Sequence, residues 1–308
     1  MAMKSRKTTI DRLRPMAASI GQYRATVTCP DTPRLDGKIA VITGGNAGIG
    51  KEIAMGLAER GAELIIAARN QKTAVPVCEE IGKVTRASVS LVPLDLSDLD
   101  SVVRAAGEIE GLLNGRTIDI MIANAGVCPP EYTVSAQGFE LGFAVNVLGH
   151  YVFIQRLINS GAFRSGRLIV MTAELYPLAR DCHPNRKYKG NILSSTRAYC
   201  RTKLGTMWLA RGFAKRHPEV EVYPVHPGVI ASGISDLSRF PIVQKILLDV
   251  ERGAQMPLYV ATQEDLQPGG YYTNKLGLAR LRKNDISLNT EKIEEFWALL
   301  EKLGSPYL

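Results

Sequence analysis

A tyrosine and a lysine spaced for one face of a helix are the residues in this chain best placed to do chemistry. Tyr199 and Lys203 stand four positions apart, and an i, i+4 spacing puts the two side chains on the same helix face. A phenol has a pKa of about 10 and accepts a proton poorly near neutral pH. A fixed ammonium beside it favours the phenolate and lowers that pKa. The pair is therefore a candidate for proton transfer.

A glycine-rich segment upstream suggests what that proton transfer accompanies. Gly44, Gly48 and Gly50 lie between a strand-like apolar run and a helix-like run. Glycines at this spacing let the backbone turn tightly and approach a pyrophosphate without a Cβ in the way. The N–H groups and the dipole at the start of the helix then favour the phosphate charge. A purely structural turn is the alternative, but the segment together with the Tyr-Lys pair predicts proton transfer beside a bound nucleotide.

Alternating periodicities predict the elements that carry these residues. Segments with apolar residues three or four apart, such as Ile49, Ile53 and Leu57, separate near-continuous apolar runs, which is typical of a parallel sheet covered on both faces. We expect a basic N-terminal extension over 1–36 and a single domain over 37–308. The last helix, 290–303, carries an apolar stripe that we interpret as a core-packing face. The predicted strands are Lys38–Thr43, Glu63–Arg69, Ser88–Asp95, Ile118–Ala123, Arg167–Thr172, Val220–His226 and Gly270–Thr273.

Composition narrows the class of protein. The chain has 308 residues with no uninterrupted apolar run of about 18, so no membrane-spanning helix is predicted. Its start lacks an apolar core followed by a cleavage site, and its five cysteines form no C-x-x-C pair, so we expect a cytoplasmic protein with reduced thiols. Residues 1–38 hold eight Lys/Arg against three Asp, in a chain of net charge +8. Such an arm could touch an acidic membrane or a partner, or it could simply be solvated. No motif supports nucleic-acid binding.

Six motifs in a fixed order resemble the short-chain dehydrogenase/reductase family, and the match covers roughly residues 35–305. These motifs are Thr43-Gly-x-x-x-Gly-x-Gly50, Asp95-Leu96, Asn124-Ala125-Gly126, Asn146, Tyr199-x-x-x-Lys203 and Pro227-Gly228. Within the family the chain is most similar to the retinol-dehydrogenase and WW-domain-oxidoreductase branch. The stretches that carry this likeness are 146–150, 199–204, 226–229 and 253–255. The resemblance implies an α/β, Rossmann-type doubly wound, mostly parallel seven-stranded sheet with helices on both faces.

The resemblance also implies roles for individual residues. Tyr199 would be the acid or base at the reacting oxygen, and Lys203 would bind the nicotinamide ribose. Asn146 would hold a water that links Lys203 to solvent. Asp95 would accept from the adenine amino group, with a helix cap as the alternative use of this side chain. The implied cofactor-binding residues are Gly44, Asn46, Gly48, Ile49, Gly50, Arg69, Asp95, Leu96, Asn124, Ala125, Gly126, Tyr199, Lys203, Pro227, Gly228 and Val229.

The end of the second predicted strand bears on the choice of cofactor. An acidic residue there would bind the ribose 2′-hydroxyl of NAD, whereas an arginine would accommodate the 2′-phosphate of NADP. This chain has Arg69 and no carboxylate in the run Ala67-Ala-Arg-Asn70. The alternative interpretation is that Arg69 is a surface residue that packs its aliphatic stem on the protein and keeps its charged group in solvent. We therefore expect NADP(H), with NAD(H) as the second choice.

One departure from the family pattern affects catalysis. The family usually places two serines after the fifth strand, the second of which donates to the substrate oxygen; here Thr172 and Ala173 occupy those positions. Alanine cannot donate, and losing one donor typically costs about 10²–10³ in rate. Thr172 could take over as a catalytic residue, or Glu174 or Tyr176 could act in a changed reaction. The remaining alternatives are a protein that binds nucleotide without turnover and a non-redox enzyme of the cyclase or lyase type.

The substrate side is less defined by sequence. Residues 230–250, with an apolar run from Phe240, lie where the family places a substrate lid, and 175–195 predicts a loop with a basic run, Arg186-Lys-Tyr-Lys189. We expect a small, mostly apolar carbonyl or alcohol substrate. His150 is interpreted as a structural hydrogen-bonding residue, and no spacing predicts a metal site. Peripheral membrane contact and a homodimer or homotetramer are left open.

Overall fold

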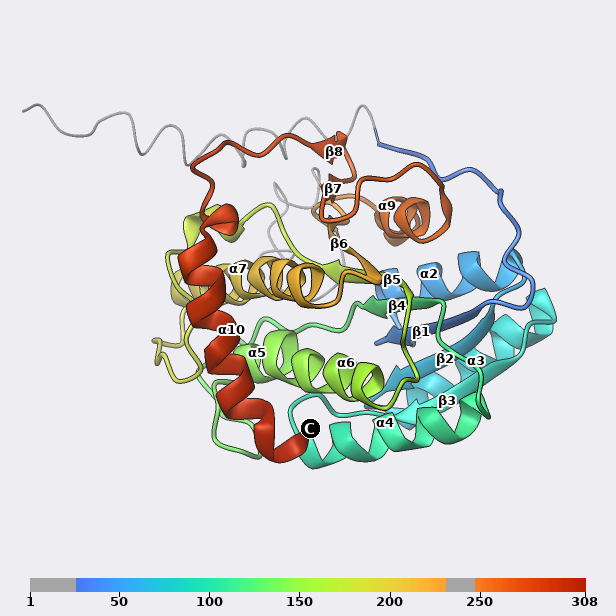
Figure 1. The fold of residues 1–308 in the computed structure, drawn as a ribbon, viewed down its shortest axis with the longest axis horizontal. Helices are drawn as coiled ribbons and strands as arrows, with labels where there is room; N and C mark the ends of the chain where they lie inside the picture. The colour runs from blue at the N-terminus through green and yellow to red at the C-terminus, as the bar shows by residue number, and fades with distance from the viewer. Residues whose placement is uncertain (1–25, 231–246) are drawn as a thin grey trace, which may run out of the picture.

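Eight strands form one sheet within the described residues, 26–230 and 247–308, of the computed structural model (Figure 1). The strand order is β3-β2-β1-β4-β5-β6-β7-β8. Because β1 pairs with both β2 and β4, the chain reverses its winding direction there, and open α/β sheets bind ligands at such a point. The strands are β1 Ile39–Thr43, β2 Glu63–Ala68, β3 Val89–Pro93, β4 Ile120–Ala123, β5 Gly166–Met171, β6 Val220–His226, β7 Tyr271–Thr273 and β8 Gly277–Ala279.

The predicted doubly wound α/β class is confirmed, but the predicted strand count of seven is wrong. The additional strand, β8, pairs antiparallel with β7, whereas the other pairings in the sheet are parallel. β8 has only three residues, and its middle residue, Leu278, is 42% exposed. A short edge strand with an exposed side chain has no apolar run or alternation for periodicity to detect.

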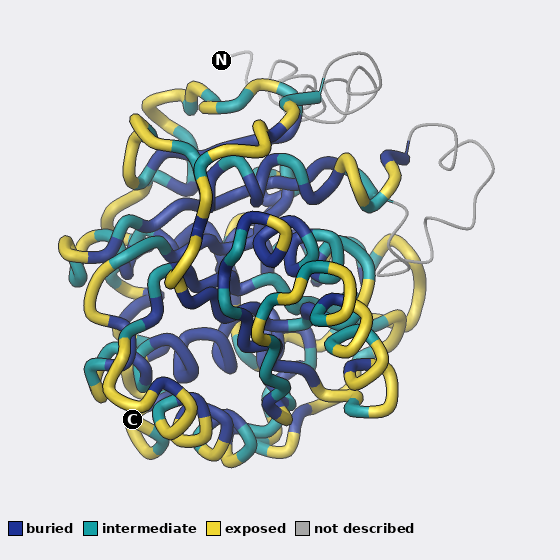
Figure 2. The backbone as a smooth tube through the Cα atoms, turned by 90° about the vertical axis from the view of Figure 1, so that its right-hand side faces the viewer, coloured by how far each residue is buried: buried dark blue, intermediate teal, exposed yellow. Residues whose placement is uncertain are grey.

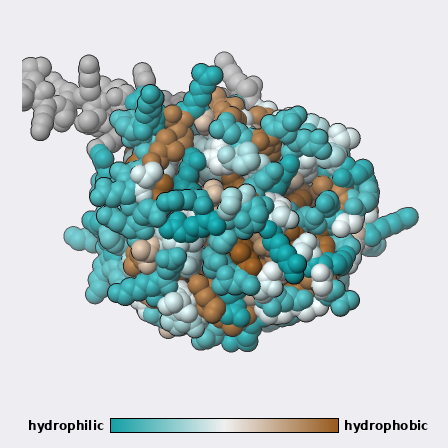
Figure 3. All heavy atoms as spheres, viewed as in Figure 1, coloured by the Kyte–Doolittle hydropathy of each residue, from teal (hydrophilic) through white to brown (hydrophobic). Residues whose placement is uncertain are grey.

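Helices cover both faces of the sheet, as Figure 1 shows. Successive residues of β1 enter opposite cores: Val41 packs into a cluster with α4, α6, α7 and α10, and Ile42 into a cluster with α2, α3 and α9. Buried segments of the backbone lie inside and more exposed segments lie at the periphery (Figure 2), and hydrophilic side chains dominate the face in Figure 3. The main helices are α2 Gly48–Glu59, α3 Gln71–Thr85, α4 Leu99–Leu113, α6 Gly149–Asn159, α7 Ile192–Arg216, α9 Val250–Thr262 and α10 Thr290–Gly304.

The last helix, α10, packs across α7 and α6, which confirms the predicted core-packing stripe. Trp297 is 2% exposed and makes edge-on contacts with Tyr151 and Phe213. A Cβ at Gly212 of α7 would lie 2.1 Å from the Trp297 ring, so glycine is required where the two helices touch. This packing immobilises the helix that carries Tyr199 and Lys203.

The helical run Leu141–Asn159 passes beside the site and contains one irregular turn. It begins as the short α5 (Leu141–Phe143), becomes a π-helix, η2, over Ala144–Leu148, and continues as α6. By length and composition this run could cross a membrane, but 78% of its apolar window is buried inside the domain. Its apolar character is therefore that of a core helix. Asn146 lies in the middle of the π-turn, a feature that often marks functional sites.

The predicted N-terminal extension is described only from residue 26, and residues 26–36 lie against the domain. Cys29 is 6% exposed, and its backbone N–H donates to Gln255 Oε1 at 2.9 Å. Arg60 Nη2 donates to the Pro30 carbonyl at 2.6 Å. Residues 1–25, and most of the predicted substrate lid (231–246), lie outside the described residues.

Candidate functional site

The glycine segment makes the turn that the sequence predicts, and its backbone conformation or close contacts require glycine at three positions. Gly44 has φ +68°, in the left-handed region that favours glycine. A Cβ at Gly50 would lie 2.2 Å from the Gly44 carbonyl oxygen and 2.6 Å from Asn124 Nδ2. Gly48 also has a left-handed φ, +53°, although an added Cβ there would meet nothing within 4 Å. The turn therefore folds tightly on itself while its outer side stays open to the cleft.

The start of α2 is chemically suited to an anion. Its N-cap residue, Ala47, provides no side-chain hydrogen bond, and its first turn contains no acidic residue. The N-termini of α3, α4, α7, α9 and α10 are all capped by an Asn or Asp side chain. The first N–H groups of α2 are thus left without the partner that those five helices have. A phosphate group fits such a helix start both in charge and in hydrogen bonding.

A buried threonine holds the two strand ends that flank the turn. Thr43 Oγ1 accepts hydrogen bonds from the backbone N–H groups of Asn124 and Ala125, each at 3.0 Å, and lies 2.9 Å from His150 Nε2. Asn124 Nδ2 donates to the carbonyls of Thr43 and Gly44 at 2.9 and 3.3 Å. The predicted structural role of His150 is confirmed, and burial lowers the pKa of this imidazole to about 4.

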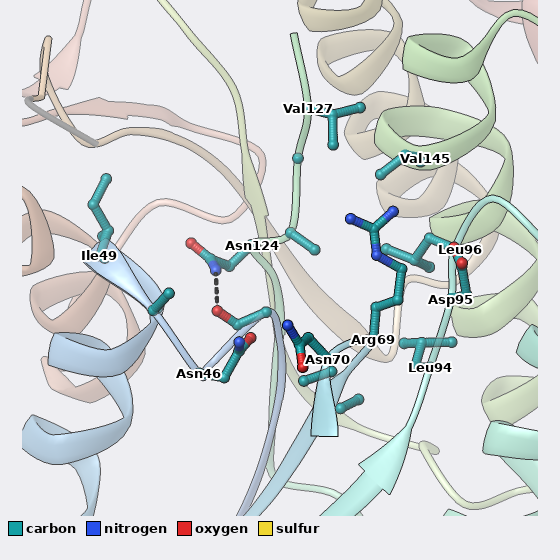
Figure 4. Close-up of a pocket in the computed structure, with 18 residues that line it drawn as sticks. Asn46, Ile49, Arg69, Asn70, Leu94, Asp95, Leu96, Asn124, Val127 and Val145 are labelled. Atoms are coloured by element: carbon teal, nitrogen blue, oxygen red, sulfur yellow. Dashed lines mark hydrogen bonds between the residues drawn. The ribbon is translucent and has the colours of Figure 1, made fainter. Parts of the chain in front are cut away.

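A cleft runs from the glycine turn along the carboxyl ends of β2, β3 and β4 (Figure 4). It brings together eleven of the residues predicted to bind cofactor: Gly44, Asn46, Gly48, Ile49, Gly50, Arg69, Asp95, Leu96, Asn124, Ala125 and Gly126. The lining does not include Tyr199, Lys203, Pro227, Gly228 or Val229, which come from α7 and the loop after β6. Sequence reasoning missed seven lining residues, all next to or within two positions of predicted ones: Ala47, Ala67, Ala68, Asn70, Leu94, Val127 and Val145.

The end of β2 presents Arg69 to this cleft. Arg69 is exposed, and in Figure 4 its side chain extends across the cleft toward Val145. Its neighbour Asn70 caps α3 by accepting from the N–H groups of Lys72 and Thr73. Asn46 of the glycine turn donates to Thr73 Oγ1 at 2.9 Å. The mouth of the cleft at this point therefore offers a guanidinium and polar groups, and no carboxylate lies within the segment 67–73.

Asp95 has a local partner as well as a position on the cleft. Its Oδ1 accepts from the backbone N–H of Ser97 at 2.9 Å and from the Ser97 hydroxyl at 2.6 Å. The cap of α4 is Asp98, which accepts from the Asp100 N–H. Asp95 therefore shapes the turn before α4 but does not cap the helix, and this is a different structural use from the helix cap considered on sequence grounds.

Tyr199 and Lys203 lie on one face of α7, as their spacing predicts, with Lys203 Nζ 5.5 Å from the centre of the Tyr199 ring. Lys203 Nζ donates to the Met171 carbonyl at 2.9 Å, and its side chain passes close to Gly126 at the end of the cleft. The expected lowering of the phenol pKa is wrong for this structure, because burial raises the pKa of Tyr199. Burial also lowers the pKa of Lys203 to about 8. Desolvation thus outweighs the attraction between the two charged forms.

Asn146 joins the loop after β4 to α7. Its Oδ1 accepts from the Val127 N–H at 2.8 Å, and its Nδ2 donates to the Val127 carbonyl and to Thr202 Oγ1, each at 2.9 Å. The π-turn gives this buried side chain access to both partners. These bonds fix the loop after β4 against α7. The predicted role of holding a water stays a prediction.

The position of the missing serine lies at the end of β5. Thr172 Oγ1 donates to the backbone carbonyl of Lys203 at 3.0 Å, and Thr172 is 3% exposed. A hydroxyl has one proton to donate, so Thr172 could serve a substrate oxygen only by giving up this bond. Next to it, Ala173 is 8% exposed. Glu174 Oε2 lies 3.9 Å from His226 Nε2 at the end of the neighbouring strand.

Comparisons with known proteins agree with this geometry. The short chain dehydrogenase family profile matches residues 38–177. Retinol dehydrogenase 12 of Mus musculus is 35% identical over 301 residues, covering 91% of this chain and 90% of the relative. The protein is a short-chain dehydrogenase. The WW domain-containing oxidoreductase of Drosophila melanogaster is 32% identical over 293 residues, covering 87% of this short-chain dehydrogenase and 69% of the relative. The likeness to the retinol-dehydrogenase branch is thereby confirmed.

Solved structures show the same fold for this short-chain dehydrogenase. A crystal structure of an uncharacterized protein from Mycobacterium paratuberculosis has a TM-score of 0.71 and 26% identity, covering 91% of this chain and 98% of that one. A Shigella flexneri short chain dehydrogenase complexed with NADP has a TM-score of 0.63 and 20% identity, covering 78% of this chain and 98% of that one. The chain therefore belongs to a family of oxidoreductases, and this family binds NAD(P).

Proposed function

We propose that this short-chain dehydrogenase reduces or oxidises a small, mostly apolar carbonyl or alcohol with NADP(H), and that Tyr199 handles the proton. The observation that carries the proposal is the placement of the Tyr199–Lys203 face of α7 beside Gly126, where the glycine-lined cleft ends. When bound, the dinucleotide would supply the hydride. Gly44, Gly48 and the uncapped start of α2 would hold its pyrophosphate.

The chain's own residues account for the other requirements of the reaction. Because burial raises the pKa of Tyr199, the phenol stays protonated near neutral pH and suits the role of acid toward a carbonyl oxygen. Lys203 holds a positive charge next to that phenol, fixed by the Met171 carbonyl. The hydrogen bonds of Asn146 with Val127 and Thr202 hold the loop after β4 against α7. The NADP preference rests on Arg69 and on the lack of an acid in the segment 67–73.

The test is turnover by the purified full chain, followed as loss of reduced-nicotinamide absorbance with a panel of apolar aldehydes and ketones. The relatives named retinol dehydrogenases make long polyene aldehydes the first substrates to try. Tyr199→Phe keeps the ring and removes the hydroxyl, so we expect turnover to fall by at least about 10²-fold with NADPH binding retained. Full activity in Tyr199→Phe would refute the role of this phenol.

The alanine at position 173 favours a second candidate function, in which the protein binds the nucleotide with little or no turnover. Alanine at this position removes a donor that the family normally aims at the substrate oxygen, and Thr172 is bonded elsewhere. Tight NADPH binding by calorimetry, with no turnover on any carbonyl and no difference between the wild type and Tyr199→Phe, would select this candidate over the first.

A further inference from the structure

The segment 186–197, here called the basic loop, carries a charge excess that the proposed reaction does not use. It runs Arg-Lys-Tyr-Lys-Gly-Asn-Ile-Leu-Ser-Ser-Thr-Arg, with four cations and no carboxylate. Among the described residues, the acid that forms an ion pair with this segment is Asp181, which lies 2.6 Å from Arg186 and also 3.5 Å from Arg201 of α7. Lys187, Lys189 and Arg197 are exposed, and no ion pair joins them to other described residues.

Two aliphatic side chains project from the same segment into solvent. Ile192 and Leu193, the first two residues of α7, are 42% and 61% exposed. Single exposed aliphatic residues are ordinary, but two in succession with cations on both sides form an amphipathic surface.

The basic loop is held in place on its neighbour, so the aliphatic pair has a fixed orientation. The Tyr188 hydroxyl donates to the carbonyls of Pro129 and Glu131 at 3.0 and 2.9 Å. The Tyr188 ring makes an edge-on contact with Tyr132, with ring centres 5.9 Å apart. Asn191 and Ser194 complete a capping box at the start of α7. A preorganised surface loses little conformational entropy when it binds.

We propose that the basic loop docks on an anionic phospholipid surface, with Ile192 and Leu193 inserted at the boundary of headgroups and acyl chains. Lys187, Lys189 and Arg197 would then face the lipid phosphates and carboxylates. Aliphatic residues bracketed by cations match this partner, since insertion needs apolar area and anionic headgroups attract each cation. A single-stranded nucleic acid would favour a free aromatic face for stacking, and the Tyr188 ring is already in contact with Tyr132.

Docking there would place the catalytic face next to the lipid. Tyr199 lies six residues after Leu193 on the same helix, a rise of about 9 Å. An apolar substrate dissolved in a bilayer would therefore meet the protein close to its reacting group. Vesicle binding itself needs no turnover, so this inference stands or falls independently of the proposed function.

The test is cosedimentation of the full chain with phosphatidylcholine vesicles that contain or lack about 30% phosphatidylserine. We expect binding only with phosphatidylserine, and weaker binding in high salt because ions screen the cations. Lys187→Gln with Lys189→Gln removes two charges and should weaken partitioning about 30-fold. The matched control, Lys83→Gln with Lys302→Gln, removes two exposed charges from other helices and should leave partitioning unchanged.

The aliphatic pair is tested in the same assay. Ile192→Ser with Leu193→Ser should weaken partitioning roughly tenfold or more, whereas Val84→Ser, at a side chain 64% exposed on α3, should have no effect. If the serine variant does not fold, Leu193→Trp gives a second readout, since insertion would shift its fluorescence to the blue when vesicles are added. Equal binding by the basic-loop variants and the wild type, loss of binding only with Lys4→Gln, Arg6→Gln and Lys7→Gln, or an unshifted Leu193→Trp spectrum would each overturn the proposal.

Discussion

Replacing Lys203 with methionine should stabilise the protein even though it removes a predicted catalytic residue. Lys203 is 5% exposed, and burial lowers the pKa of its ammonium from the usual 10.5 to about 8. One pKa unit corresponds to about 1.4 kcal/mol, so holding this charge costs about 3 kcal/mol at neutral pH. Methionine fills a similar volume without the charge. It gives up the hydrogen bond to the Met171 carbonyl, which is 2.9 Å long and contributes about 1 kcal/mol.

Lys203→Met should therefore raise the free energy of unfolding by about 2 kcal/mol at about pH 7. The gain should depend on pH with a definite sign. Because the folded pKa of Lys203 lies below the unfolded one, the unfolded chain binds more protons between about pH 8 and 10.5. In that window the wild type gains stability relative to the variant. The difference should shrink to a few tenths of a kcal/mol at about pH 9.5.

The assay is urea unfolding of wild type and Lys203→Met without nucleotide, followed by circular dichroism at both pH values. The groups that titrate in both proteins cancel in the comparison, so the change with pH isolates Lys203. A variant less stable than the wild type at about pH 7, or a difference that does not change with pH, would refute the argument that desolvation dominates at this residue.

Four further substitutions probe the cleft and the reaction. Gly50→Ala should abolish NADPH binding in calorimetry, because its Cβ would lie 2.2 Å from a carbonyl oxygen of the turn; Gly107→Ala, with no atom within 4 Å, should bind normally. Thr43→Val leaves the Ala125 N–H without its acceptor and removes one of the two acceptors of the Asn124 N–H, so it should lower the free energy of unfolding by about 1–3 kcal/mol, measured by urea unfolding; an unchanged midpoint would contradict this. Ala173→Ser should raise kcat by roughly 10-fold or more if only a donor is missing, and no gain in steady-state rates would favour the non-catalytic candidate. Arg69→Ala should weaken NADPH binding by at least about tenfold and leave NADH binding unchanged; equal losses for both would assign Arg69 a structural role.

The sequence predicted those parts of the site that depend on local backbone geometry. The turn at Gly44 and Gly50 follows from steric requirements of neighbouring residues, and the shared face of Tyr199 and Lys203 follows from helical periodicity. The strands of the central sheet were predictable because their runs are apolar on both faces. These features need no knowledge of distant contacts.

What the sequence did not predict depends on contacts between distant segments. The direction of the Tyr199 pKa shift is set by burial under other elements, which spacing within one helix does not reveal. The π-turn places the Asn146 side chain against hydrogen-bond partners that are 19 and 56 residues away in the sequence, Val127 and Thr202. The hydroxyl of Thr172 bonds to a carbonyl 31 residues further along the chain. The edge strand β8 has too few residues to carry a pattern.

The most direct test of the central claim is a crystal structure of the full chain with NADPH and an apolar carbonyl compound. We predict the pyrophosphate at the start of α2, the 2′-phosphate at Arg69, and the Tyr199 hydroxyl within hydrogen-bonding distance of the carbonyl oxygen, with the Ala173 methyl facing that oxygen as well. A nicotinamide bound away from α7, or a Tyr199 hydroxyl turned away from the carbonyl, would contradict the proposed reaction.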